Sequence, residues 1–129
     1  MQLASAFYWD MNDETRKFGK RFFDKTTRMP TSIQAADYSA TMNYLKAVEA
    51  AKSVDADKVM AAWRAMPMND FYASGTLRPD GRYVHDMYLL QVKKPSESTK
   101  PWDYFKVVKK IPGDQIFTTK AESKCALWK

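Results

Sequence analysis

The chain has 129 residues, of which 45% are hydrophobic and 28% charged, a size and composition typical of one globular domain. Its net charge is +6, but Lys and Arg are spread among acidic residues, without a block of about five or six like charges. No apolar run reaches the roughly 20 residues that cross a bilayer, and the first residues lack the basic start of a secretory signal. These features argue against a membrane span and a nucleic-acid partner, and leave a small basic nucleic-acid-binding module as a minor alternative.

The single cysteine, Cys125, cannot form a disulfide within the chain, so it is either a free thiol or half of a bridge to another segment. One Cys and one His do not make a metal site, and the four glycines are too scattered for a phosphate-binding loop. We therefore expect no metal and no cofactor.

The chain begins with an apolar run over residues 3–9, which has the length of a strand. Asn12 or Asp13 then caps an amphipathic helix that ends near Thr27. Phe18 and Phe22 are four residues apart and mark its apolar face.

A second helix begins after a cap at Thr31 or Ser32 and ends near Lys52. Its larger apolar residues are distributed around most of its circumference, so we expect a central helix that is buried between layers. A third helix over residues 58–66 ends at Pro67.

Residues 68–74 are expected to form a connector, and Asp80-Gly81 predicts a turn because Gly reaches positive φ without a steric clash. Residues 83–92 and 102–111 have the composition of strands, and the short polar loop between them predicts an antiparallel hairpin. Residues 115–129 form a loosely patterned tail. The expected fold class is α/β, with about three helices followed by a β-hairpin and a C-terminal tail.

His85-Asp86 suggests acid–base catalysis, since an imidazole beside a carboxylate is half of a general-base arrangement. Adjacent residues of a strand point to opposite faces, however, so these two side chains should not pair. No serine or cysteine has the sequence context of a nucleophile. We expect a structural hydrogen bond for His85 and no enzymatic activity.

Phe7, Tyr8, Trp9 and Asp10 are the strongest binding candidates. They combine three aromatic rings and a carboxylate at the end of a strand, where ligands settle in open α/β sheets. The alternative is an edge strand whose aromatic residues pack on the helices. Tyr38, near the start of the second helix, has the same two interpretations.

Several short stretches, taken together, carry a family resemblance. They are Tyr8-Trp9-Asp10-Met11-Asn12-Asp13-Glu14-Thr15, Arg21-Phe22-Phe23, Tyr38-Ser39-Ala40, Tyr44-Leu45-Lys46-Ala47-Val48, Asp80-Gly81-Arg82, Val84-His85-Asp86-Met87-Tyr88, Val92-Lys93-Lys94-Pro95-Ser96-Glu97-Ser98 and Trp102-Asp103-Tyr104. As a set they resemble the C-terminal third of branched-chain-amino-acid-type solute-binding proteins of ABC transporters.

The resemblance implies a type I periplasmic binding protein, in which two α/β lobes joined by crossover strands close on a small solute. Residues 1–11 would be a second-lobe strand and crossover, 12–71 first-lobe helices, and 72–129 the return crossover with the second-lobe hairpin and tail. The residues facing the cleft would be Phe7, Tyr8, Trp9, Asp10 and Tyr38. Intact members are much longer, so we expect a C-terminal fragment.

The implied function is that of the solute-binding component of an ABC importer, located in the periplasm and working with an ABC permease. Its solute would be an amino acid or a similar small polar or aromatic compound; a ligand-sensing receptor domain of the same fold is the alternative. In a fragment, Phe18, Phe22, Tyr44 and Trp63 would expose apolar surface, which favours a homo-oligomer or a domain swap.

Overall fold

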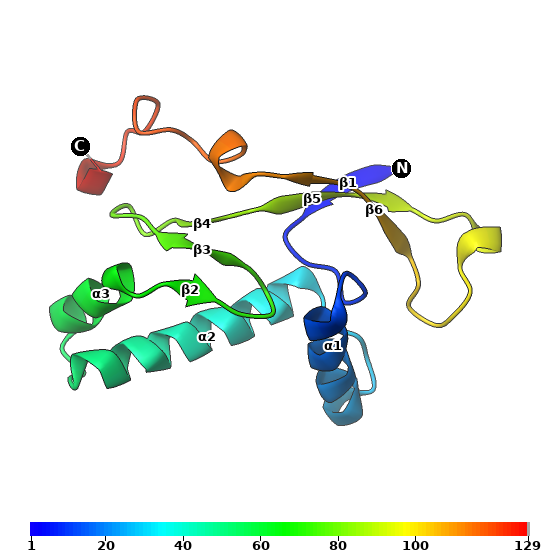
Figure 1. The fold of residues 1–129 in the computed structure, drawn as a ribbon, viewed down its shortest axis with the longest axis horizontal. Coiled ribbons are helices and arrows are strands. Elements are labelled where there is room, and N and C mark those ends of the chain that lie inside the picture. The colour runs from blue at the N-terminus through cyan, green and yellow to red at the C-terminus, as the bar shows by residue number, and fades with distance from the viewer. Residues whose placement is uncertain (129) are drawn as a thin grey trace.

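The computed structural model describes residues 1–128 and arranges them as helices with two small sheets along the long axis of the molecule (Figure 1). The first sheet has the order β1-β5-β6, and the second has the order β2-β3-β4. The strands are β1 (Gln2–Ser5), β2 (Met68–Asn69), β3 (Ser74–Leu77), β4 (Tyr83–His85), β5 (Met87–Val92) and β6 (Phe105–Ile111). The helices are α1 (Asp13–Thr26), α2 (Ser32–Ala51) and α3 (Ala56–Ala65), and short 3₁₀ turns are η1 (Pro95–Glu97), η2 (Gly113–Gln115) and η3 (Ala126–Trp128). The mixed helix and sheet class predicted from the sequence is confirmed.

The first sheet confirms the predicted antiparallel hairpin, because β5 pairs with β6 from Met87↔Ile111 to Val92↔Phe105. β1 adds to the other edge of β5, with Leu3 opposite Leu90. The strand predicted over residues 3–9 is too long, since β1 ends at Ser5. The Ser5 hydroxyl donates to the Phe7 carbonyl at 2.8 Å, and this local bond turns the chain out of the sheet.

The second sheet contains the predicted turn, in which Gly81 has φ 81° and its N–H donates to the Arg78 carbonyl at 2.9 Å. The single strand predicted over residues 83–92 is wrong: it breaks at Asp86, and β4 and β5 belong to different sheets. The Asp86 carboxylate explains the break, because it accepts from the Gly113 N–H at 3.0 Å and pairs with Lys110 at 2.7 Å. The predicted connector at 68–74 includes β2 and the start of β3, too short to detect from alternation.

All three helices begin at capping residues, and Asn12 and Thr31 are among the caps predicted from the sequence. The Asn12 and Thr31 side chains accept from the backbone N–H of Thr15 and Gln34, and each makes a reciprocal capping box. Asp55 caps α3 by accepting from the Lys58 N–H at 3.1 Å, so this helix begins slightly before the predicted residue 58.

The prediction that α2 is buried between layers is wrong for the described residues. Its buried positions are small or polar and form one stripe: Ala35, Ser39, Asn43 and Ala47. Large apolar residues on its other sides are open to solvent, including Ile33 with 71% and Leu45 with 52% of their surface exposed. Residues 1–128 cover one side of the helix only. Phe18, expected to be exposed, is buried with 4% exposed, because it packs against Phe7 and Phe71.

Within residues 1–128 the chain leaves the first sheet for α1 at residues 6–12, enters it from the second sheet at Asp86, and leaves it again at Pro112. After Pro112 the tail returns to the second sheet (Figure 1). Phe117 contacts the His85 ring, and Arg78 donates to the Thr118 carbonyl at 2.8 Å. The described tail therefore packs on the β3–β4 turn.

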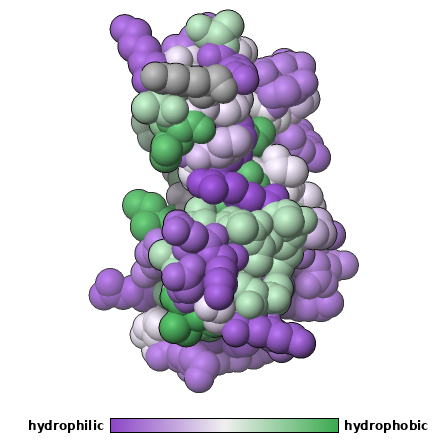
Figure 2. Space-filling model, turned by 90° about the vertical axis from the view of Figure 1, so that its left-hand side faces the viewer, coloured by the Kyte–Doolittle hydropathy of each residue, from purple (hydrophilic) through white to green (hydrophobic). Residues whose placement is uncertain are grey.

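The surface alternates between apolar and polar areas at the end where α3, the end of α2 and the tail lie. Figure 2 shows a hydrophobic area at mid-height on this end, bordered above and below by hydrophilic residues. Among the helices described, none combines the length and the hydropathy required to cross a bilayer.

Candidate ligand-binding site

The candidate site is centred on the connection between β1 and α1, where the sequence places its aromatic binding candidates. Phe7, Tyr8 and Trp9 are buried, with 3%, 7% and 9% of their surfaces exposed. They belong to the main hydrophobic core, in which Phe7 makes edge contacts with Phe18 and Phe71 at ring-centroid distances of 6.1 Å. Phe7 therefore packs on helix α1 through Phe18, as the alternative interpretation expects.

Tyr8 and Trp9 join this connection to the β5–β6 hairpin. The Tyr8 hydroxyl donates to the Trp102 carbonyl at 2.9 Å, and the Trp9 indole N–H donates to the same oxygen at 3.0 Å. The Tyr8 oxygen also accepts from the Tyr104 N–H at 3.0 Å. Burial raises the pKa of Tyr8 above its ordinary value, so its hydroxyl remains a donor at neutral pH. Because these polar atoms have partners, a solute would contact the faces of the two rings.

Next to these rings lies a hollow of about 290 Å³. It is lined by β1 with the β1–α1 connection, by the β5–β6 hairpin and by the α1–α2 connection: Leu3, Ser5, Phe7, Tyr8, Trp9, Met29, Pro30, Thr31, Ser32, Leu90, Trp102, Tyr104 and Phe105. The volume is near the lower end of the range for small-molecule sites, and the aromatic lining is typical of them. The hollow lies where the first sheet meets the helices.

Asp10 lies beside this hollow but does not line it. Its carboxylate pairs with Arg16 at 3.0 Å and with Lys100 at 2.7 Å. Burial alone would raise the pKa of Asp10, but the hydrogen bonds with Lys100 and Arg16 lower it below the ordinary value overall. The Lys100 ammonium also lies 5.0 Å from the centre of the Trp9 ring, a cation–π distance. The structure thus shows a cation held between a carboxylate and an indole face.

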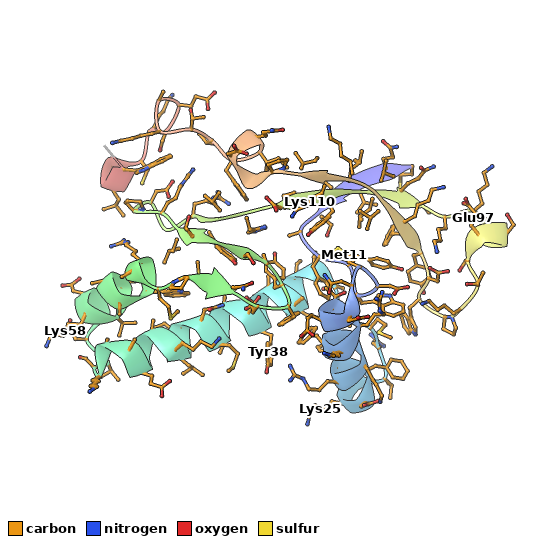
Figure 3. All side chains as sticks on the ribbon, in the orientation of Figure 1. Met11, Lys25, Tyr38, Lys58, Glu97 and Lys110 are labelled. Atoms are coloured by element: carbon orange, nitrogen blue, oxygen red, sulfur yellow. The ribbon has the colours of Figure 1, made fainter. Side chains whose placement is uncertain are left out.

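Tyr38 is not brought to the hollow. It lies on α2, on the lower side of the helix in Figure 3, with 41% of its surface exposed. Its ring contacts Phe18 at 5.3 Å and Phe71 at 5.9 Å, so it reaches Phe7 only through these two residues. The structure brings together Phe7, Tyr8, Trp9 and Asp10, and leaves Tyr38 apart.

The geometry at His85 agrees with the structural role expected for it. Its Nδ1 lies 2.8 Å from the Asp86 carbonyl oxygen, whereas the Asp86 carboxylate is paired with Lys110. Lys110 lies on β6, near the connection that carries Met11 (Figure 3). Across residues 1–128 no three His, Cys, Asp or Glu side chains gather as a metal site would require.

A larger hollow, of about 450 Å³, lies between α2, α3 and the β3–β4 turn. Its lining comes from the second sheet, its helices and Phe117, without the hairpin or the β1–α1 connection. The smaller hollow is lined by Phe7, Tyr8 and Trp9 and by residues of both the first sheet and the helices, so it is the better candidate.

Sequence reasoning missed Lys100, which it placed in a polar, proline-flanked loop, and Trp102, which it placed at the start of a strand. Trp102 has the unusual φ of 67° for a residue other than Gly. That conformation directs its carbonyl to Tyr8 and Trp9. No signal in the sequence reveals φ, so these contacts could not be predicted.

Comparison with known proteins shows what the chain is similar to. The sequence profile of a family described as periplasmic binding protein matches residues 1–99. The chain is similar to a crystal structure of a periplasmic binding protein from Burkholderia mallei, with 56% identity and a TM-score of 0.98. That similarity covers 100% of this chain and 34% of the Burkholderia mallei protein.

A second solved structure is a branched chain amino acid ABC transporter periplasmic ligand-binding protein from Burkholderia xenovorans. It is 47% identical over 99% of this chain and 34% of its own, with a TM-score of 0.95. A leucine binding protein from Thermotoga maritima shares the fold at 19% identity and a TM-score of 0.70, over 90% of this chain and 32% of its own. A search of curated proteins finds no match. The chain spans about a third of the length of the solved structures it matches.

Proposed function

The chain belongs to the periplasmic binding protein family, and from that premise we propose that it is part of the solute-binding component of an ABC importer. The solute is an amino acid or a similar small polar or aromatic compound. The observation that carries this proposal is the aromatic hollow of about 290 Å³ beside the connection between the first sheet and the helices.

The lobe assignment made from the sequence is part of the proposal. The first sheet with the hairpin forms the second-lobe portion, and the helices belong to the first lobe. The chain leaves or enters the first sheet at residues 6–12, Asp86 and Pro112, which supports an arrangement of two bodies joined by short connections. The hollow lies beside the first of these connections, where closure of two lobes would enclose a solute.

In this proposal, the rings of Phe7, Tyr8 and Trp9 form the apolar wall, and Asp10 provides the negative charge. The Lys100 ammonium, between Asp10 at 2.7 Å and the Trp9 ring at 5.0 Å, marks a position suited to a cation. The α-ammonium of an amino acid would take this position by displacing Lys100, whose side chain is 48% exposed. Tyr38 acts indirectly, through Phe18 and Phe71.

The place and partners of the protein follow from its family. Periplasmic binding proteins act as non-enzymatic solute carriers, so we propose a periplasmic location, delivery to an ABC permease and no catalytic activity. Self-association of the 129-residue chain stays a prediction from its exposed apolar residues.

The test is a solute screen on a grafted protein, in which this chain replaces the matched third of the Burkholderia mallei protein. The TM-score of 0.98 and the 56% identity make this graft feasible. Thermal unfolding is followed with each amino acid and with small aromatic acids, since a bound solute raises the midpoint by mass action. A raised midpoint with at least one of them supports the proposal, and no shift with any of them contradicts it.

A further inference from the structure

The cation held beside the aromatic hollow belongs to the chain itself. The Lys100 ammonium lies 2.7 Å from the Asp10 carboxylate and 5.0 Å from the centre of the Trp9 ring. Trp9 also lines the hollow, so this position adjoins the space proposed for the solute. The proposed function puts the α-ammonium of an amino acid here, which requires Lys100 to leave. The new partner of the displaced ammonium therefore decides which solutes are favoured.

The Asp10 carboxylate is held in place by a second residue as well as by Lys100. Arg16 Nη1 donates to Asp10 Oδ1 at 3.0 Å, whereas Lys100 pairs with the other oxygen, Oδ2. Arg16 lies on α1, and the Asp10 side chain is only 17% exposed. When Lys100 leaves, Asp10 therefore keeps one partner on a helix and presents Oδ2 to an incoming cation.

The backbone on both sides of Lys100 is fixed, which leaves its side chain as the part that moves. The buried Asp103 carboxylate accepts from the Thr99 N–H at 3.0 Å and from Lys93 at 2.6 Å. The Asp103 N–H donates to the Lys100 carbonyl at 3.3 Å. The Lys100 side chain, in contrast, is 48% exposed. A lysine carries its compact charge on a flexible four-carbon stem, so the ammonium can swing while the loop stays in place.

We propose that Lys100 determines specificity by exchanging partners: the α-ammonium of the solute replaces it at Asp10, and Lys100 then pairs with the α-carboxylate of the solute. This inference rests on the proposed function and narrows its solutes to zwitterions with an apolar side chain. One ion pair before binding becomes two after it, so each of the four charges keeps a partner. The aromatic rings of the hollow contact the apolar side chain.

The exchange disfavours solutes that carry only one of the two charges. An amine without a carboxylate would displace Lys100 from Asp10 and give the lysine no anion in return. An acid without an amine would attract Lys100 and leave Asp10 with Arg16 alone. A charged group that loses its partner in a partly enclosed site costs free energy. The zwitterion should therefore bind at least about fivefold more tightly than either analogue, the upper value for an exposed ion pair.

The experiment measures the affinity of the grafted protein for two sets of compounds by calorimetric titration. Each set contains an amino acid and the analogues that lack one charge: phenylalanine with phenethylamine and hydrocinnamate, and leucine with isoamylamine and isocaproate. Lys100→Met removes the ammonium and keeps an unbranched apolar stem. Lys106→Met is the matched control, because Lys106 lies on the same hairpin, pairs with Glu97 at 3.2 Å and is 45% exposed. Circular dichroism verifies that both variants keep the fold.

In the unchanged graft, the amino acid of at least one set should bind at least about fivefold more tightly than both of its analogues. Lys100→Met should reduce the preference over the amine to less than about twofold, because the α-carboxylate loses its partner, and Lys106→Met should leave it unchanged. A preference that survives in Lys100→Met would overturn this inference and leave the proposed function standing, since a solute still binds. Tightest binding of an amine or an acid, or binding of none of these compounds, would also overturn it, whereas the wider solute screen decides the proposed function.

Discussion

The Tyr8 hydroxyl donates a hydrogen bond of 2.9 Å to the carbonyl of Trp102, which is 94 residues away in sequence. Trp102 has a left-handed backbone with φ 67°, a conformation that costs about 1 kcal/mol for a residue other than Gly. The same carbonyl also accepts from the Trp9 indole, and these two bonds offset that cost. The pair fixes the hairpin loop against the connection that leaves the first sheet, and so shapes one wall of the hollow.

Tyr8→Phe should destabilise the chain by about 1–3 kcal/mol, because it removes the donor to Trp102 and the acceptor of the Tyr104 N–H. Urea unfolding measures this loss. Tyr104→Phe is the control, since Tyr104 is 51% exposed and its change should be within about 0.5 kcal/mol. Equal losses in the two variants would show that the hydroxyl of Tyr8 has no structural role.

Asp70→Ala should cost about 2–3 kcal/mol, because the buried side chains of Ser39 and Asn43 both lose an acceptor. Asn69→Ala is a matched neighbour that removes only an exposed bond with Ser74, so its effect should be below about 1 kcal/mol. Urea unfolding of both variants provides the comparison. A smaller loss for Asp70→Ala than for Asn69→Ala would contradict the anchoring of α2 by Asp70.

Gly75 and Gly81 should respond differently to substitution by Ala. A Cβ added at Gly75 would overlap the Val84 carbonyl oxygen on the neighbouring strand, so Gly75→Ala should cost at least about 2 kcal/mol. A Cβ at Gly81 meets nothing within 4 Å, and only its φ of 81° penalises the change, by about 1–2 kcal/mol. Thermal unfolding ranks the two, and the reverse order would be inconsistent with this packing of β3 on β4.

The chain should lose stability in acid. The hydrogen bond from Lys93 and that from the Thr99 N–H lower the pKa of Asp103 below its ordinary value, and the bond from Lys110 lowers that of Asp86. A carboxylate with a lowered pKa in the folded state stabilises the protein above its unfolded pKa of about 4, and this contribution is lost as the pH falls further.

Urea midpoints measured from pH 7 to pH 2 should therefore be flat above about pH 5 and should decline below it. Asp103→Asn should reduce the decline, because its carboxylate no longer takes up a proton on unfolding. Glu49→Gln, on the exposed side of α2, is the control. If the urea midpoint of Asp103→Asn declines as much as that of the unchanged chain, Asp103 does not contribute to the loss of stability in acid.

Much of the fold could be predicted because local signals decide it. Asn12 and Thr31 identify the helix starts through side-chain chemistry, and Gly81 identifies a turn through its freedom at positive φ. The hairpin follows from two strand-like runs separated by a short loop. In each of these cases the determining residues lie within a few positions of one another.

The failures concern contacts between residues far apart in sequence. The break at Asp86 depends on Lys110 and Gly113, which the sequence does not place beside it. The burial of Phe18 depends on Phe71, whose ring stacks on it at 4.0 Å. In the candidate site, Phe7 to Asp10 could be selected as three aromatic residues and a carboxylate after a strand, whereas the contacts of Lys100 and Trp102 depend on how the hairpin loop folds back.

The most direct test of the account asks whether the hollow beside Tyr8 and Trp9 holds the solute. Truncating either ring would also remove core packing, so filling the hollow is the cleaner change. Ser32→Phe adds a ring at its rim, and Ser53→Phe adds one beyond the opposite end of α2.

The measurement is calorimetric titration of the grafted protein and these two variants with the solute that raises its unfolding midpoint most. The account predicts that Ser32→Phe weakens binding at least tenfold, about 1.4 kcal/mol, and that Ser53→Phe leaves the affinity unchanged. Unchanged affinity in Ser32→Phe would contradict the account and place the solute outside this hollow.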